Sequence, residues 1–280
     1  TPINELSDAM RQIGSDRLTL RSRSTRRRDE IGRLASSFDD LLQRLSEAFA
    51  RERQFISDAS HELKTPLTSI NSNAQMLLRW GDQNPKVLHE SLETIAGESA
   101  TLADMVNGML TLAKADRGDD IPKEPVSLAQ VASEVVKHAQ LRAEEKNLTL
   151  DFHYDGMPTV LGDPGLLRQL VSNLVDNALK FTERGGVEVK VGGKGPEAFV
   201  EVSDSGPGVP EDELPLVFDR FYRADKARSR AVPGTGLGLA IVRSIARVHN
   251  GEVTVGRSAR GGALFRVRLP AMTIPLTGPS

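Results

Sequence analysis

The chain has 280 residues, with 36 Lys and Arg against 38 Asp and Glu, a net charge of −2, 39% hydrophobic residues and no cysteine. This length suffices for about two domains with a substantial core, and the composition excludes a disordered or fibrous chain. The balanced charge gives no reason to expect nucleic acid, the lack of cysteine excludes disulfides and thiol chemistry, and neither a membrane-spanning apolar run nor a secretion signal is recognisable.

Apolar residues first recur at steps of three and four, which is the spacing of amphipathic helices. The first series is Ile3, Leu6, Met10 and Ile13, and the second begins at Ile31. Residues 19–28 between them are polar and basic, without periodicity. We therefore predict two helices joined by an extended connector. The run Arg26-Arg27-Arg28 is interpreted as solvated connector rather than as a nucleic-acid patch.

A seven-residue apolar repeat follows, which is typical of helices that pack as coiled coils. Its first column is Phe49, Ile56, Leu63, Ile70 and Leu77. After a break at residues 81–85, the second column is Leu88, Leu92, Ile95, Ser99, Leu102, Val106, Met109 and Ala113. Two long helices joined by a short break form an antiparallel hairpin. Because one hairpin hides neither stripe well, we predict a homodimer whose two hairpins close a four-helix bundle.

The composition changes at residues 117–125, which we interpret as a linker that ends with Pro125. Beyond it, helical and strand patterns alternate, as in an α+β domain. We predict helices over 128–145, over 164–181 with Asp163 as cap, and over 237–249. We predict strands over 148–153, 187–191, 198–202, 252–255 and 264–269. The tail from Pro270 is expected to be frayed.

His61 lies five positions after Ile56, on the helix face turned away from the predicted bundle core. An exposed surface histidine is the simplest interpretation, but its neighbours favour a chemical role. Thr65 lies one helical turn later on the same face. Pro66 lies inside the helix, where proline costs about 3 kcal/mol and leaves a backbone carbonyl without its partner. A bend beside a solvent-facing imidazole indicates a helix that can present a nucleophile.

The segment Ser60-His61-Glu62-Leu63-Lys64-Thr65-Pro66-Leu67 resembles the H-box of bacterial sensor histidine kinases, His-Glu-Leu-Arg/Lys-Thr-Pro, without departures. The resemblance implies that the neutral imidazole of His61 attacks the γ-phosphate of ATP in line. Glu62 would hydrogen-bond the other ring nitrogen and accept its proton. Thr65 would orient water when the protein instead dephosphorylates its partner.

Three polar residues in the second half have the chemistry of a metal-triphosphate site. Asn173 and Asn177 are one helical turn apart, and Lys180 follows three residues later. By themselves they are equally compatible with a polar helix face. An amide oxygen, however, is a hard ligand for Mg²⁺ that adds no negative charge beside phosphates. Lys180 can neutralise phosphate charge.

Two glycine-containing loops lie further along the chain. Asp204-Ser205-Gly206-Pro207-Gly208 is either an ordinary turn or a base-binding loop. In the second case the Asp204 carboxylate accepts a hydrogen bond from the adenine amino group, and the glycines let the backbone approach the base. Gly234-Thr235-Gly236-Leu237-Gly238-Leu239 opens a helix, whose N-terminus attracts phosphate, but it matches neither a Walker loop nor a dinucleotide fingerprint. Residues 218–233 between them are predicted to form a mobile lid.

The order of these segments resembles the N, G1, F and G2 boxes of the histidine-kinase catalytic domain. This domain shares its two-layer α+β ATPase fold with type II topoisomerases and heat-shock chaperones. The resemblance implies that Asn177 is the chief Mg²⁺ ligand, with Asn173 beside it, and that Asp204 binds adenine. The other implied nucleotide-binding residues are Lys180, Phe181, Gly206, Gly208, Arg223 at the γ-phosphate, Gly234, Thr235, Gly236, Leu237 and Gly238.

The segment Asp29-Glu30-Ile31-Gly32 resembles the second helix of a HAMP relay module, which in this family follows a transmembrane helix. The resemblance therefore implies the cytoplasmic portion of a membrane-embedded sensor. We expect a HAMP module over 1–50, a dimerisation and histidine phosphotransfer domain over 51–117 and a linker over 118–125. The catalytic ATP-binding domain is expected over 126–270, followed by a frayed tail over 271–280.

The resulting prediction is a dimeric histidine kinase, dependent on ATP and Mg²⁺, that transfers phosphate from His61 to an aspartate of a response regulator receiver domain. It would also dephosphorylate that regulator. One alternative is a chaperone- or topoisomerase-type ATPase, which leaves His61 unexplained. Another is a signalling adaptor with a vestigial ATP site, against which Asn177 and Asp204 argue. The remaining histidines are interpreted as structural or surface residues: His89, His138, His153 and His249.

Overall fold

The computed structural model describes residues 30–81, 83–116, 121–223 and 234–272. The predicted first helix, the basic connector, residues 224–233 of the predicted lid and the tail from 273 lie outside the described residues. The chain divides into two units, residues 1–64 and residues 65–280. No helix among the described residues is long and apolar enough to cross a membrane.

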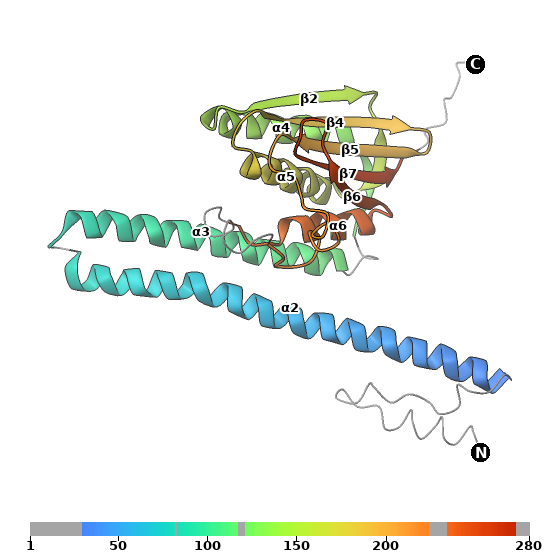
Figure 1. The fold of residues 1–280 in the computed structure, drawn as a ribbon, viewed down its shortest axis with the longest axis horizontal. Helices are drawn as coiled ribbons and strands as arrows, with labels where there is room; N and C mark the ends of the chain where they lie inside the picture. The colour runs from blue at the N-terminus through green and yellow to red at the C-terminus, as the bar shows by residue number, and fades with distance from the viewer. Residues whose placement is uncertain (1–29, 82, 117–120, 224–233, 273–280) are drawn as a thin grey trace. The chain divides into compact units, whose positions relative to one another are not determined.

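The apolar series that begin at Ile31 and Phe49 belong to one helix, α2, which spans Glu30–Trp80 and contains Pro66. A tight turn leads to α3, Pro85–Asp116 (Figure 1). The N–H of Gly81 donates to the carbonyl of Leu77 over 2.9 Å, and Asn84 Oδ1 accepts from the N–H of Lys86 over 3.0 Å. Asn84 therefore caps α3, and the predicted helical hairpin is confirmed.

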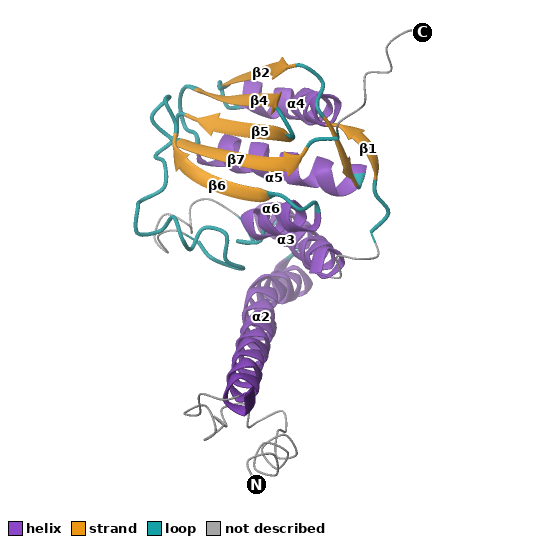
Figure 2. Cartoon of the chain, turned by 90° about the vertical axis from the view of Figure 1, so that its right-hand side faces the viewer, coloured by secondary structure: helices purple, strands orange, loops and turns teal. Residues whose placement is uncertain are grey.

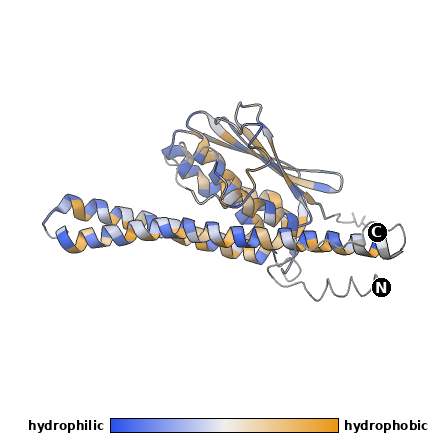
Figure 3. Cartoon of the chain, turned by 60° about the horizontal axis from the view of Figure 1, so that its bottom comes forward, coloured by the Kyte–Doolittle hydropathy of each residue, from blue (hydrophilic) through white to orange (hydrophobic). Residues whose placement is uncertain are grey.

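Most of the predicted heptad column on α3 is exposed in the chain by itself, while Ile95, Leu102 and Met109 are half-buried. Leu92 is 50% exposed and Val106 is 46% exposed. Figure 3 shows hydrophobic residues recurring along both α2 and α3. A different face of α3 is buried, through Met105, Gly108, Thr111, Leu112 and Ala115. The exposed column is the stripe from which we predicted a partner helix.

The C-terminal part contains a five-stranded sheet with three helices on one face (Figure 2). The helices are α4 (Leu128–Glu145), α5 (Pro164–Phe181) and α6 (Gly238–Val248). The sheet has the order β2-β4-β5-β7-β6, where β2 is Thr149–Asp155, β4 is Gly186–Lys194, β5 is Glu197–Asp204, β7 is Ala263–Pro270 and β6 is Glu252–Arg257. The pair β2–β4 is parallel and the other pairs are antiparallel. The predicted two-layer α+β architecture is confirmed.

Residues that alternate along the strands form the core between sheet and helices. Val189 of β4, Val200 of β5 and Val267 of β7 are completely buried, as are Leu167 and Leu174 of α5. Burying such a side chain contributes about 1.5–3 kcal/mol. The opposite strand positions carry charged pairs, including Lys190 with Glu188 and Arg266 with Glu201. One face of the sheet is thus packed against the helices, and the α5 residues of the candidate site are held by this packing.

Two predictions at the ends of this domain were wrong. Glu124 and Pro125, interpreted as linker, belong to strand β1 (Glu124–Ser127), which pairs with β3 (Thr159–Gly162) in a small second sheet. Proline is tolerated in such an edge strand, where it needs no ladder N–H. The tail is held through Met272, whose N–H donates to Thr159 over 2.7 Å. The start of the tail is therefore ordered rather than frayed.

Candidate active site

His61 is exposed on α2, as predicted from its place in the heptad. Thr65, one turn further along the same helix, is also exposed, whereas Glu62 is half-buried. Pro66 lies inside the helix and is buried. The bend expected at Pro66 stays a prediction. An exposed imidazole on a regular helix is accessible to a phosphoryl donor, which is the arrangement that the sequence pattern required.

Asn173 of α5 lies beside the first turn of α6. Asp163 caps α5 by accepting the N–H of Leu166 over 2.8 Å. Asn173 is half-buried, and its Nδ2 atom is buried without a hydrogen-bond partner in the chain. A side chain at Gly238, the first residue of α6, would lie 3.9 Å from the Asn173 amide. Because a buried amide without a partner is unfavourable, Asn173 fits a position that a polar ligand completes.

Lys180 is the centre of a cluster of positive charges. Burial, the Arg223 guanidinium and the Lys146 ammonium together lower the pKa of Lys180 to about 8. Its ammonium lies 5.0 Å from the centre of the Phe181 ring. It also lies against Gly234, where any side chain would overlap Nζ. A cluster of cations whose mutual repulsion depresses a lysine pKa is suited to binding a polyphosphate, which removes that repulsion.

Asp204 ends strand β5 and is only 4% exposed. Its Oδ1 accepts the backbone N–H of Gly206 over 2.8 Å and of Ala263 over 3.1 Å. Burial raises the pKa of Asp204, and these two hydrogen bonds oppose the rise. A side chain at Gly262 would overlap Oδ1. The carboxylate is therefore fixed in orientation, and among the described residues Oδ2 has no hydrogen-bond partner.

The segment that begins at Phe218 is bound to the glycine loop before α6. The N–H of Phe221 donates to the Gly236 carbonyl over 3.0 Å. Phe221 has φ 60° and Gly236 has φ 68°. A side chain at Gly236 would lie 2.8 Å from the Phe221 backbone, so the close approach requires glycine. An aromatic residue in the left-handed region is strained by about 1–3 kcal/mol, as is found at ligand-binding loops.

Leu237, a predicted nucleotide-binding residue, has a buried side chain. Its side chain is 1% exposed and packs against Gly108 of α3, where a side chain would lie 3.3 Å from Leu237 Cδ1. Any contact of Leu237 with nucleotide therefore falls to its backbone. Its N–H lies 3.3 Å from the Thr235 hydroxyl. Gly108, Gly262 and Ala263 were not predicted, because each acts through a residue distant in sequence.

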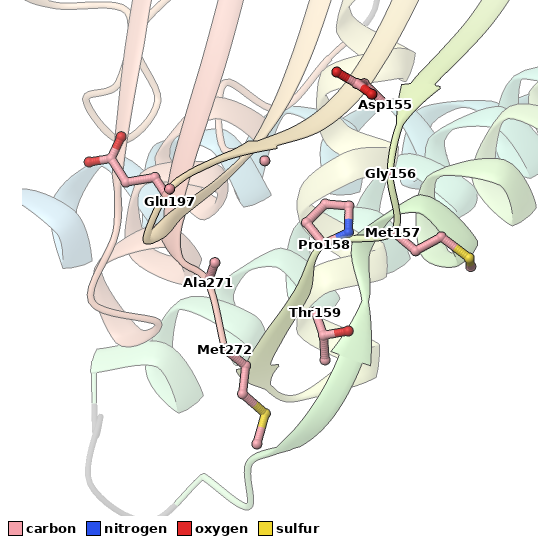
Figure 4. Close-up of a pocket in the computed structure, with 10 residues that line it drawn as sticks. Asp155, Gly156, Met157, Pro158, Thr159, Glu197, Ala271 and Met272 are labelled. Atoms are coloured by element: carbon pink, nitrogen blue, oxygen red, sulfur yellow. The ribbon is translucent and has the colours of Figure 1, made fainter. Parts of the chain in front are cut away.

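A separate pocket of about 370 Å³ lies at the turn after β2 and the β4–β5 hairpin (Figure 4). Its lining includes the acidic residues Asp155 and Glu197 and the apolar side chains of Met157 and Met272. None of the predicted nucleotide-binding residues lines it. Its acidic residues are unfavourable for a triphosphate, so the candidate site remains the region around Asn173, Lys180 and Asp204.

No group of three or more His, Asp or Glu side chains in the described ranges is arranged to hold a metal ion. An all-protein metal cage is therefore not found there. Mg²⁺ commonly takes one or two protein oxygens and completes its coordination with phosphates and water. The half-buried amide of Asn177 on α5, one turn from Asn173, supplies a donor of this kind.

Three family descriptions match consecutive parts of the chain. Residues 1–47 match the HAMP domain, and residues 51–118 match the His Kinase A (phospho-acceptor) domain. Residues 162–273 match the histidine kinase-, DNA gyrase B-, and HSP90-like ATPase family. His61 falls in the second range, and Asn173, Lys180 and Asp204 fall in the third.

Two curated relatives align with nearly the whole chain. Sensor histidine kinase YkoH of Bacillus subtilis (strain 168) is 36% identical over 258 residues, covering 91% of this chain and 56% of its own length. Signal transduction histidine-protein kinase ArlS of Staphylococcus aureus (strain USA300) is 32% identical over 275 residues, covering 95% of this chain and 59% of its own length. The chain thus spans less than two thirds of these curated relatives.

Solved structures share the fold. Full-length ShkA in complex with AMPPNP has a TM-score of 0.59 and 29% identity, covering 79% of this chain and 46% of that chain. The histidine kinase AdeS of Acinetobacter baumannii has a TM-score of 0.58 and 21% identity, covering 75% of this chain and 97% of that chain. The second likeness concerns the fold alone.

Proposed function

This chain belongs to the sensor histidine kinases, and we propose that it is an ATP-dependent kinase that phosphorylates its own His61. It then passes the phosphoryl group to an aspartate of a response regulator receiver domain. The observation that carries the proposal is the combination, in one chain, of an exposed H-box imidazole with a cation-rich site. That site contains the unpartnered Asn173 amide, Lys180 and the oriented Asp204 carboxylate.

The chemistry divides between the two parts of the chain. The neutral imidazole of His61 attacks the γ-phosphorus of ATP. A nitrogen–phosphorus bond forms while the bond from the γ-phosphorus to the bridging oxygen breaks, and ADP leaves with that electron pair. Glu62 accepts the ring proton. A regulator carboxylate then attacks the phosphorus to give an acyl phosphate, and His61 leaves as imidazole after regaining a proton.

The nucleotide roles follow from the chemistry of each side chain. Asp204 Oδ2 accepts a hydrogen bond from the adenine amino group, which favours ATP over GTP. Lys180 and Arg223 neutralise the phosphates, and the backbone of residues 234–238 approaches them at the start of α6. Mg²⁺ bound with ATP would be held by the Asn177 amide oxygen beside Asn173, and it would supply charge neutralisation at the phosphates.

We propose that the protein acts as a homodimer, in which the exposed columns of α2 and α3 form a four-helix bundle. Leu92 and Val106, each about half exposed, would be buried by the second copy. Thr65 would position water for dephosphorylation of the regulator. Support comes from the match to the phospho-acceptor domain and from the exposure of Thr65 beside His61.

We further propose that the chain is the kinase part of a longer membrane sensor. Its HAMP module, over 1–50, would follow a transmembrane helix. The phosphotransfer domain would span 51–117 and the catalytic domain 126–270. Strand β1, Glu124–Ser127, supports starting the catalytic domain two residues earlier, at Glu124. The larger size of the relatives and the match of residues 1–47 to the HAMP domain support this arrangement.

Incubation with γ-labelled ATP and Mg²⁺ tests the proposed activity. We expect an acid-labile, base-stable label on the wild type and none on His61→Gln. The matched control is His89→Gln, which replaces an exposed histidine of α3 that pairs with Glu93 and should leave labelling intact. Equal labelling of His61→Gln would refute the proposal. ATP hydrolysis without labelled protein would support the ATPase alternative instead.

A further inference from the structure

His249, at the C-terminal end of α6, is a buried histidine that the proposed activity does not use; it is 4% exposed. Its Nδ1 lies 2.7 Å from the carbonyl oxygen of Ile245, and its Nε2 lies 3.1 Å from the backbone nitrogen of Asp163. A carbonyl can only accept, and a backbone N–H can only donate. These two contacts therefore fix the neutral tautomer that carries its proton on Nδ1.

The imidazole joins the end of α6 to the beginning of α5. Asp163 caps α5 through its side chain, while its own N–H donates to His249. A side chain at Gly162 would lie 2.5 Å from His249 Cδ2 and 2.7 Å from Nε2. The glycine therefore makes room for the ring. His249 is the side chain through which α6 is hydrogen-bonded to the capping residue of α5.

The two helices that His249 joins also meet at the candidate nucleotide site. Gly238, at the start of α6, faces the Asn173 amide, and His249, at its end, contacts Asp163. Ten residues of α5 and eleven of α6 separate these two contacts, which correspond to about 15 and 17 Å at 1.5 Å per residue. The helices thus run antiparallel over matched lengths. A shift at His249 would move Gly238 along α5.

The charged groups that act on the ring come from neighbouring elements. Lys123, just before β1, donates from Nζ to the Val248 carbonyl over 2.7 Å, and Asp163 precedes α5. Burial lowers the pKa of His249 and Lys123 lowers it further, while the Ile245 carbonyl and Asp163 oppose them. A second proton would occupy Nε2. That nitrogen would then be a donor facing the Asp163 N–H, and the bridge between the helices would be lost.

We propose that His249 is a positioning residue for nucleotide binding: its neutral ring holds α6 in register with α5, and a second proton releases that register. The inference rests on the nucleotide site proposed above. The pKa of His249 in the fold lies below its ordinary value of 6.5. Its stabilising contribution is therefore complete above pH 6.5 and is lost as pH falls through the lower pKa of the folded state.

Two substitutions separate the bridge from the buried ring. In His249→Gln, the glutamine Oε1 can lie near the position of Nε2 and accept the hydrogen bond from the Asp163 N–H. The glutamine side chain does not titrate. In His249→Asn, the amide nitrogen can lie near the position of Nδ1 and donate a hydrogen bond to the Ile245 carbonyl. The Asp163 N–H is then left without a partner. The matched control is His138→Gln, which removes an exposed histidine of α4. Circular dichroism checks that each variant of the full chain is folded.

The test is calorimetric titration with Mg²⁺ and AMPPNP at about pH 7.5 and at the lowest pH at which circular dichroism still shows wild type and His249→Gln folded, because the pKa of His249 in the fold lies below 6.5. At the higher pH we expect His249→Gln to bind like wild type and His249→Asn to bind roughly tenfold more weakly, as for one lost hydrogen bond. At the lower pH, wild type and His138→Gln should lose affinity relative to His249→Gln.

Three results would overturn the inference or its premise. Wild-type affinity in a folded His249→Asn variant at the higher pH would show that the bridge does not position the site. If the ratio of the AMPPNP affinities of wild type and His249→Gln is the same at both pH values, the proton on His249 has no role. This comparison remains decisive even if His249→Asn does not fold. No binding of AMPPNP by wild type at either pH would instead refute the proposed nucleotide site.

Discussion

Replacing Asp204 by Asn should change which base the protein binds. Oδ1 is occupied by the N–H groups of Gly206 and Ala263, at 2.8 and 3.1 Å. An amide oxygen can keep both bonds, so the amide nitrogen must take the place of Oδ2. A donor would then face the adenine amino group, itself a donor. Losing a hydrogen bond to a charged acceptor costs about 1.5–3 kcal/mol, which corresponds to roughly ten- to more than a hundredfold in ATP affinity.

Calorimetry with ATP and inosine triphosphate measures this effect, because inosine presents a carbonyl at the position of the adenine amino group. We expect Asp204→Asn to bind ATP more weakly and inosine triphosphate more tightly than wild type does. Unchanged ATP affinity, or no relative gain for inosine triphosphate, would refute the role of Asp204 as the base reader. Asp204→Ala should bind both nucleotides weakly, because it also loses the two backbone contacts.

The substitution Asp204→Asn should not weaken the fold. Burial raises the pKa of Asp204, so the ionised carboxylate is less favourable in the folded than in the unfolded chain. The stability linked to this group is therefore present below its unfolded pKa and lost as pH rises through its folded pKa. We expect the melting temperature of Asp204→Asn to match or exceed that of wild type near neutral pH. A clearly lower melting temperature there would show that the ionised carboxylate stabilises the protein.

Other substitutions test the remaining roles. Asn177→Ala should abolish labelling by ATP while the dimer persists in sedimentation, and unchanged labelling would exclude the metal role. Because the pKa of Lys180 is about 8 in the chain alone, triphosphate binding should take up a proton near that pH, and affinity should fall by at most about tenfold per pH unit above it. Lys180→Arg should flatten this dependence, and calorimetry in two buffers that detects no proton uptake would contradict it. Thr65→Ala should keep autophosphorylation but dephosphorylate the regulator more slowly, so a normal rate would reject the role of Thr65.

Local signals in the sequence predicted most helices and strands of the catalytic part. Asp163 followed by Pro164 gave the start of α5, and its end at Phe181 coincides with the prediction. Helix α4 also has its predicted bounds, Leu128–Glu145. These boundaries depend on caps and periodicity within a few residues. Pairings between distant segments were not accessible, and β1 was missed because its four residues are defined only by β3.

The candidate site shows the same division. The order of the polar motifs was sufficient to select Asn173, Lys180 and Asp204 as candidates, since each belongs to a recognisable local pattern. The N–H of Ala263 that orients Asp204 comes from the next strand of the sheet, 59 residues later. Gly108 is a poor helix former in the interior of α3. The close packing of the Leu237 side chain against this position explains why a glycine is found there. His249 was interpreted as structural or surface, and its link to the α5 cap became visible only with both helices in place.

The central claim is that phosphate from ATP is transferred to His61. The most direct measurement is mass spectrometry of the phosphorylated chain, digested and fragmented under alkaline conditions that preserve a phosphoramidate. We expect phosphate on the peptide that contains His61, on its imidazole. Phosphate on another residue, or none after incubation with ATP and Mg²⁺ under activating conditions, would contradict it.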